Sequence, residues 1–76
     1  NMIKVNIRNN VERRSVLVDE TTTIRQFMLD NDMAFSPARF TLDGVTITES
    51  NMDKNFDQFG ATDGCTFSQT VKSDNN

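Results

Sequence analysis

Apolar and polar residues alternate along two runs near the start of the chain, residues 2–8 and 14–19. Strict alternation is typical of strands buried on one face. The residues that share the apolar side are Ile3, Val5, Ile7, Val16 and Val18. Asn9-Asn10 stands between the runs, and asparagine tolerates left-handed backbone angles. The pattern predicts a β-hairpin with one apolar face.

A short helix is expected after the second run. Thr23 followed by Gln26 matches a capping box, so the helix should begin near Ile24. Its apolar face would comprise Ile24, Phe27 and Met28, together with Asn31. Ser36-Pro37 should stop any helical continuation.

The second half returns to strand patterns. Residues 39–43 alternate, Asp43-Gly44 is a strong turn signal, and residues 45–47 complete a second hairpin. Residues 50–60 favour a one-turn helix anchored by its aromatic residues. A closing strand is expected at residues 66–71, followed by a disordered tail at 73–76.

Two glycines in the second half are expected to reverse the chain. Gly60 should adopt a left-handed conformation, and Asp63-Gly64 should form a tight corner before the closing strand. The residues expected in one core are Ile3, Val5, Val16, Val18, Ile24, Phe27, Phe40, Leu42, Phe56 and Phe67. Phe59 has the spacing of a further core aromatic.

This order of elements predicts an α+β β-grasp, in which a mixed sheet of four to five strands wraps one helix beside a short helical turn. The chain resembles ubiquitin-like proteins over residues 2–72, which we take as one domain. The matching segments are Thr23-Ile24, RFTLDG at 39–44, MDKNFDQFG at 52–60 and TDGCT at 62–66.

The resemblance also bears on conjugation. Ubiquitin-like modifiers and sulfur carriers end in Gly-Gly, whereas this sequence ends KSDNN and has its glycines at Gly44, Gly60 and Gly64. We therefore expect a non-conjugating interaction module, with a diverged sulfur carrier or protein modifier as the alternative.

The outer sheet face is the expected binding surface. Where ubiquitin carries an apolar patch, the matching positions are Thr41, Ser68 and Thr70, so partners of ubiquitin should not recognise this face. By parity the face holds five of the eight bases and none of the eleven acids, with Leu17 as its lone apolar residue. This composition favours an acidic partner protein, although basic residues also protect exposed strands from aggregation. The predicted binding residues are Lys4, Arg8, Arg13, Leu17, Arg39, Thr41, Ser68 and Lys72.

Other functions have little support in the composition. The 76 residues contain no histidine and one cysteine, Cys65, so we expect no enzyme, metal site or cofactor, and a structural thiol. A pI of about 4.6 and the lack of aromatic residues on the outer face count against nucleic acid. The single cysteine and the lack of a long apolar run predict a cytoplasmic protein with no membrane segment. We further expect a monomer of bacterial origin.

Overall fold

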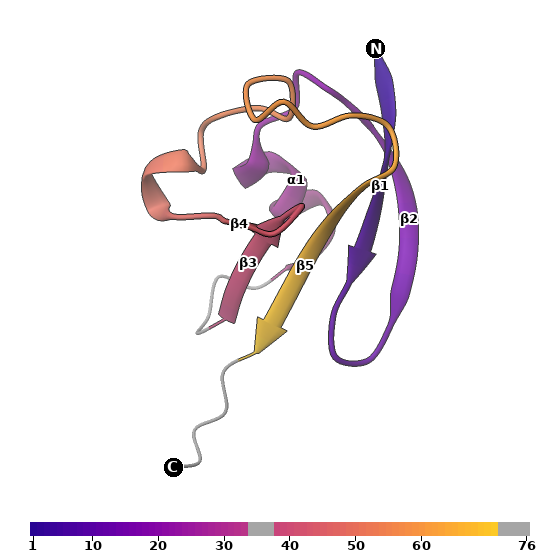
Figure 1. Ribbon diagram of the computed structural model, residues 1–76, viewed down its shortest axis with the longest axis vertical. Coiled ribbons are helices and arrows are strands. Elements are labelled where there is room, and N and C mark those ends of the chain that lie inside the picture. The colour runs from indigo at the N-terminus through magenta and orange to yellow at the C-terminus, as the bar shows by residue number, and fades with distance from the viewer. Residues whose placement is uncertain (34–37, 72–76) are drawn as a thin grey trace.

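The alternating runs form strands of one mixed sheet in the computed structural model, which describes residues 1–33 and 38–71 (Figure 1). The strand order is β2-β1-β5-β3-β4, with β1 and β5 parallel and the other neighbours antiparallel. Within the described residues the elements are β1 (Met2–Arg8), β2 (Arg13–Asp19), α1 (Ile24–Asp30), β3 (Ala38–Leu42), β4 (Val45–Thr46), the 3-10 turn η1 (Glu49–Asn51) and β5 (Cys65–Val71). The predicted β-grasp architecture is confirmed.

The β1–β2 hairpin turns by a different mechanism from the one expected. Neither Asn9 nor Asn10 has a positive φ. Instead, the Asn9 side-chain oxygen accepts hydrogen bonds from the backbone N–H groups of Val11 and Glu12, both at 2.9 Å. The left-handed explanation was therefore wrong, because a side-chain-capped turn satisfies the same backbone groups without a left-handed residue.

Helix α1 begins and ends through side-chain caps. The Thr23 hydroxyl accepts from the Gln26 backbone N–H at 3.1 Å, as predicted, but the Gln26 amide donates to Asp30 instead of closing a capping box. At the other end, the Asn31 side chain donates to the Phe27 carbonyl at 2.9 Å, and Asp32 has a φ of 56°. The helix thus ends before Ser36-Pro37, and that predicted stop lies outside the described residues.

Replacing Thr23 with alanine should lower the free energy of unfolding by about 1 kcal/mol, because an N-terminal N–H of the helix loses its acceptor. The melting temperature should fall by about 4–8 °C in a domain of this size. Thr70→Ala is the matched control, since Thr70 is exposed on β5 and caps no helix. Equal melting temperatures for the two variants would contradict a stabilising cap.

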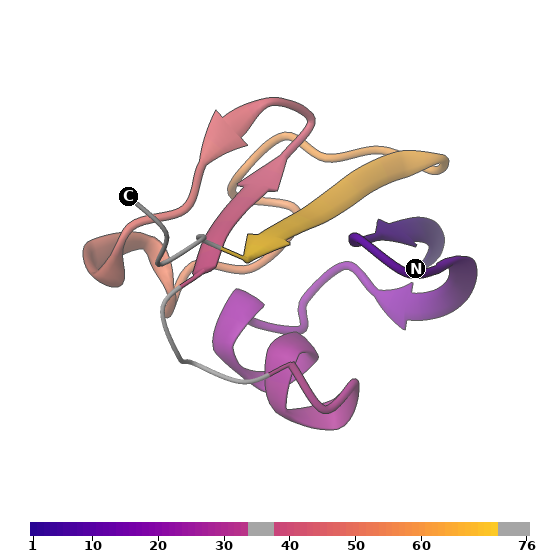
Figure 2. The same cartoon turned by 90° about the horizontal axis from the view of Figure 1, so that it is seen from below.

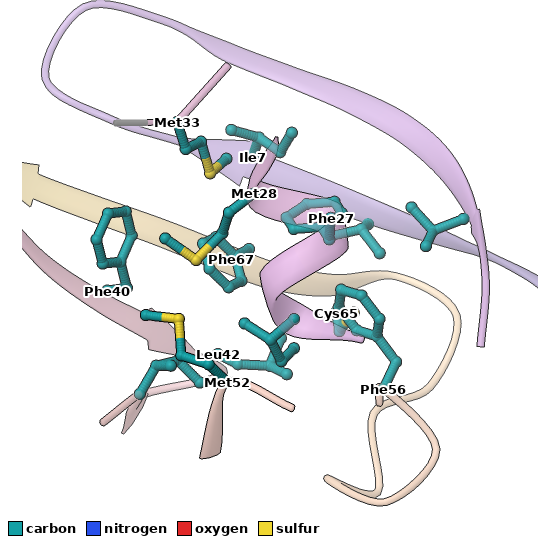
Figure 3. Packing of buried hydrophobic residues seen from close by; sticks show 14 of the residues in the cluster. Ile7, Phe27, Met28, Met33, Phe40, Leu42, Met52, Phe56, Cys65 and Phe67 are labelled. Atoms are coloured by element: carbon teal, nitrogen blue, oxygen red, sulfur yellow. The ribbon is translucent and has the colours of Figure 1, made fainter. Parts of the chain in front are cut away.

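The core lies between one face of the sheet and α1 (Figures 2 and 3). The Phe27 ring packs edge-on against Phe56 and Phe67, with ring centroids 5.1 and 5.0 Å apart. Nine of the ten predicted core residues are buried, whereas Val16 is only partly buried against the cluster, as is Phe59. The buried cluster also includes Ile7, Met28, Met33, Ile47, Met52 and Cys65.

The segment before β5 is less helical than predicted. The 3-10 turn η1 covers three residues and is followed by a series of turns. Phe56 lies in these turns, and its side chain is fully buried. Gly60 and Gly64 have φ values of 75° and 90°, so both predicted chain reversals are confirmed. Asp43 and Gly44 also have positive φ, as a tight hairpin turn between β3 and β4 requires.

The predicted tail at 73–76 and the last residue of the predicted domain, Lys72, lie outside the described residues. In the described ranges, every helix is too short and too polar to span a bilayer.

Candidate functional site

The outer face of the sheet is organised into rows of side chains that run across the strands. Residues in register on neighbouring strands lie side by side, and alternate positions along each strand point outward. The longest row contains one residue from every strand, in the order Arg13, Arg8, Ser68, Thr41 and Thr46. Four of the eight predicted binding residues therefore fall on one line.

Of two other predicted residues, Arg39 lies on an adjoining part of this face and Lys72 lies outside the described residues. Arg39 is in register with Thr70, one row further along β3 and β5, and its side chain is exposed. Lys72 lies outside the described residues, so its predicted place on the face stays a prediction.

Lys4 and Leu17 form a separate group at the other end of the β1–β2 hairpin. They are directly opposite each other, two rows away from the Arg8–Arg13 pair, which corresponds to about 13 Å along a strand. Leu17 is 69% exposed. It also lines a hollow of about 310 Å³ between β2 and α1, together with Val16, Phe27 and Asp30. The predicted apolar anchor therefore sits at the border of the face, apart from most of the bases.

The expectation that the outer face carries no acid was wrong at this end of the sheet. Asp19 shares the outward register of Leu17 and lies opposite Met2. Its carboxylate accepts hydrogen bonds from the backbone N–H and the hydroxyl of Thr21, and these bonds lower the pKa of Asp19. The residue pattern indicates that the strand ends at Asp19-Glu20, and the pairing of β1 with β2 includes Asp19, which places its side chain on the outer face.

The two other nearby acids act as backbone caps. The Asp63 carboxylate accepts from the Lys4 backbone N–H at 2.7 Å, and the Asp43 carboxylate accepts from the Thr66 backbone N–H at 2.9 Å. Asp63 thus ties the corner before β5 to β1, and Asp43 ties the turn after β3 to the start of β5. The central row and its arginines remain without an acidic neighbour in register.

The bases differ in whether an acidic side chain pairs with them. Away from the outer face, Arg14 pairs with Glu12 at 3.2 Å, and Arg25 pairs with Asp53 at 3.0 Å and Glu49 at 3.3 Å. The bases on the outer face form no ion pair within the described part of the chain. These unpaired bases are Lys4, Arg8, Arg13 and Arg39.

A second hollow, of about 350 Å³, opens on the outer face around the arginine pair. Asn6, Arg8, Arg13, Ser15 and Thr66 contribute to its lining. Parity also places Asn6, Ser15 and Thr66 on this face, although they are not among the predicted binding residues. Parity shows which side a residue faces, whereas the hollow depends on how β1, β2 and β5 are aligned with one another.

Cys65 has the environment of a structural thiol. It is buried in the core cluster, and burial, assisted by the charge of Asp43, raises its pKa. Within residues 1–33 and 38–71, no group of three or more metal-binding side chains converges on one point. The chemistry available at the outer face is therefore that of exposed guanidinium, ammonium and hydroxyl groups.

The arrangement of strands and helix matches solved structures of ubiquitin-like proteins. A ubiquitin-like domain of an Arabidopsis thaliana protein superposes with a TM-score of 0.80 at 18% identity, covering 99% of this chain and 82% of that one. The chain has a ubiquitin-like β-grasp fold. Ubiquitin from Caldiarchaeum subterraneum gives a TM-score of 0.72 at 14% identity, with both chains fully covered. Tubulin-binding cofactor B of Trypanosoma brucei gives 0.68 at 19% identity, covering 96% of this chain and 98% of that one.

Sequence comparison gave no closer relationship. No protein-family model matches the chain, and no curated protein matches it. At identities below 20%, the similarity to the ubiquitin-like structures establishes the fold but not the binding surface.

Proposed function

We propose that the domain is a non-catalytic, ubiquitin-like interaction module that binds an acidic partner protein through its outer sheet face. Ubiquitin-like domains occur as protein-interaction modules, and the matched structures include a ubiquitin-like domain and a tubulin-binding cofactor. The proposal depends on one contrast between the arginines. Within the described residues, Arg14 and Arg25 are ion-paired, whereas the outer-face arginines form no ion pair, in a chain of net charge −3.

An acidic partner would supply the missing counter-charges. Unpaired exposed bases create a local positive potential that steers an acidic surface and increases the association rate. Each individual pair contributes little, about 0.2–1 kcal/mol at an exposed site. A useful affinity therefore needs several bases acting together, and the row through Arg8 and Arg13, with Arg39 beside it, brings three of them onto one surface.

The setting proposed for this activity is the cytoplasm, because the chain carries one free, buried thiol and no partner cysteine for a disulfide. Bacterial origin and a monomeric state stay predictions.

Reversing a charge on the outer face should slow association with a partner recovered by affinity capture. Arg8→Glu and Arg39→Glu should each reduce the association rate constant by about two- to fivefold, with smaller changes in dissociation. The double variant should be slower than either single variant. The effect should shrink as the salt concentration rises, because the Debye length falls from about 10 Å at 0.1 M to about 3 Å at 1 M. Surface plasmon resonance at both salt concentrations measures these rates.

Lys54→Glu is the matched control for each single variant, because it changes the net charge by the same amount. Lys54 is exposed and lies on a loop away from the outer face. Its backbone carbonyl accepts a hydrogen bond from the Ile24 N–H at the start of α1. Its ammonium lies 6.0 Å from the centre of the Phe59 ring and forms no ion pair among the described residues. If Lys54→Glu slows association and Arg8→Glu does not, the binding surface is elsewhere, and the outer-face bases serve only to limit aggregation.

A further inference from the structure

Arg8 and Arg13 are paired directly across the β1–β2 hairpin. Like charges at directly opposite positions destabilise a sheet, because the two side chains come close together on the same face. Both side chains are exposed, and neither forms an ion pair within the described residues. The pair is therefore a concentrated double positive charge that lacks a counter-ion among residues 1–33 and 38–71.

The surroundings of the pair are already fixed by other hydrogen bonds. In the next row, the Ser15 hydroxyl donates to the Asn6 side-chain oxygen at 2.7 Å, and the Asn6 amide nitrogen donates to the Gly64 carbonyl at 3.1 Å. Arg14 also contributes to the lining of the hollow, but its guanidinium donates to Glu12 and to the Asn31 side-chain oxygen. Arg8 and Arg13 are thus the charged groups at the hollow that form no ion pair within the described residues, so their donors are available to a ligand.

Two guanidinium groups match a phosphate monoester better than a carboxylate. Each guanidinium offers five N–H donors in a planar fork and has no acceptor. A phosphate monoester carries a charge of about −1.5 to −2 at pH 7 and has three acceptor oxygens, so it can engage both forks. A carboxylate carries one charge and two oxygens, which a single arginine can satisfy.

The row continues from the arginines as a line of hydroxyl groups, formed by Ser68, Thr41 and Thr46. From β2 to β4 the row crosses four strand spacings, or about 19 Å, which equals the length of about six residues of extended peptide. An extended peptide with a phosphate at one end could therefore use the whole row, whereas a lipid headgroup would use only the arginines. The phenylalanines of the described residues lie in or against the core, so this face offers no ring on which a nucleic-acid base could stack.

We propose that the Arg8–Arg13 pair receives the phosphate of a phosphorylated serine or threonine, and that the adjoining peptide lies along the hydroxyl groups of Ser68, Thr41 and Thr46. This inference rests on the proposed function, because it specifies the acidic group that the partner presents to the outer face. It adds to that function a binding site for the acidic group, the chemical class of that group, and the direction in which the bound peptide lies along the row.

The test uses three peptides and an isotope-labelled sample of the full chain. Each peptide is an acetylated and amidated octapeptide of alanine and glycine. The first contains one phosphoserine, the second contains two adjacent glutamates with the same total charge, and the third contains an unmodified serine. Amide chemical shifts followed by NMR give both the affinity and the surface contacted. The phosphopeptide should bind at least about threefold more tightly than the diglutamate peptide, and should shift the amides of Asn6, Ser15 and Thr66.

Variants separate the pair from the rest of the basic face. Arg8→Gln and Arg13→Gln should each weaken phosphopeptide binding about tenfold, because each removes a charge-assisted, forked contact. Arg39→Gln removes the same charge from the neighbouring row and should weaken binding less than about twofold. Arg8→Lys keeps the charge but not the fork, so its affinity should lie between those of wild type and Arg8→Gln. These side chains are exposed, and amide dispersion shows whether each variant is folded.

The pH dependence gives a second readout. A phosphate monoester gains a proton with a pKa of about 6, whereas carboxylates titrate near pH 4 and histidine near 6.5. The chain has no histidine, and Glu12, the acid of the hairpin turn, is paired with Arg14. Phosphopeptide affinity should therefore fall about threefold or more between pH 7 and pH 5, while diglutamate affinity stays constant.

Several outcomes would overturn the phosphate site. One is equal affinity for the phosphopeptide and the diglutamate peptide, and another is an equal loss of binding in Arg39→Gln and Arg8→Gln. Either result would indicate a diffuse basic surface, which contradicts the phosphate site but agrees with the proposed function. Absence of phosphopeptide binding at millimolar concentration would also overturn the site, as would Arg8-dependent binding to phosphoinositide vesicles without phosphopeptide binding. Shifts confined to α1 would count against both the site and the proposed function.

Discussion

Replacing Phe67 with alanine should lower the free energy of unfolding by about 3–5 kcal/mol. Phe67 is fully buried, and its ring lies 5.0 Å from the Phe27 ring and 6.0 Å from the Phe40 ring, measured between centroids. The substitution removes the contact that joins β5 to both α1 and β3 (Figure 3). Small domains have a total stability of about 5 kcal/mol or slightly more, so a large fraction of the variant should be unfolded at room temperature.

Urea denaturation followed by circular dichroism measures this loss. Phe67→Leu should retain part of the packing and cost less than alanine, which keeps the comparison measurable if the alanine variant does not fold. Val11→Ala is the control for loss of an apolar side chain at the surface, since Val11 is 88% exposed, and it should change stability by less than about 0.5 kcal/mol. A midpoint for Phe67→Ala close to that of Val11→Ala would contradict the central position of Phe67 in the core.

The sequence predicted the sheet because a strand buried on one face has a simple two-residue period. Ile3, Val5 and Phe67 are in the core for this reason. Met33 and Met52 were not among the predicted core residues, because neither belongs to a run with a strand or helix period. Their burial depends on where the chain passes over the end of the core, which no local period records.

The candidate site was predictable as a face but not as a row. Parity places Arg8, Arg13, Ser68 and Thr41 outward, and each of them is in an outward register. Their alignment on one line follows from the parallel pairing of β1 with β5, which joins residues about 60 positions apart. Thr46 was not assigned to the face, because the length of the β3–β4 turn decides its register.

The sequence predicted where the chain turns more reliably than it predicted the conformation of each turn. The left-handed conformation predicted for Gly60 is present, and the turn glycines Gly44 and Gly64 also have positive φ, since glycine is the residue that adopts it at least cost. Asn9 adopts a negative φ and caps the turn with its side chain. Asparagine can do either, so its presence predicted a turn without predicting the mechanism.

Substitutions at Gly64 should destabilise the domain in the order asparagine, alanine, valine, with valine costing about 1–3 kcal/mol. Gly64 has a φ of 90°, and a Cβ added there would meet nothing within 4 Å, so the cost arises from the backbone conformation and not from a clash. The corner is held from both sides, because the Gly64 N–H donates to the Lys4 carbonyl at 2.8 Å and the Gly64 carbonyl accepts from Asn6. Asparagine tolerates positive φ best among the three, and a β-branched side chain tolerates it least. Urea midpoints for the three variants provide the measurement, with the exposed Asp57→Ala as a neutral surface control. If valine cost no more than asparagine, the corner would be free to adopt a negative φ, and the entry to β5 would not depend on glycine.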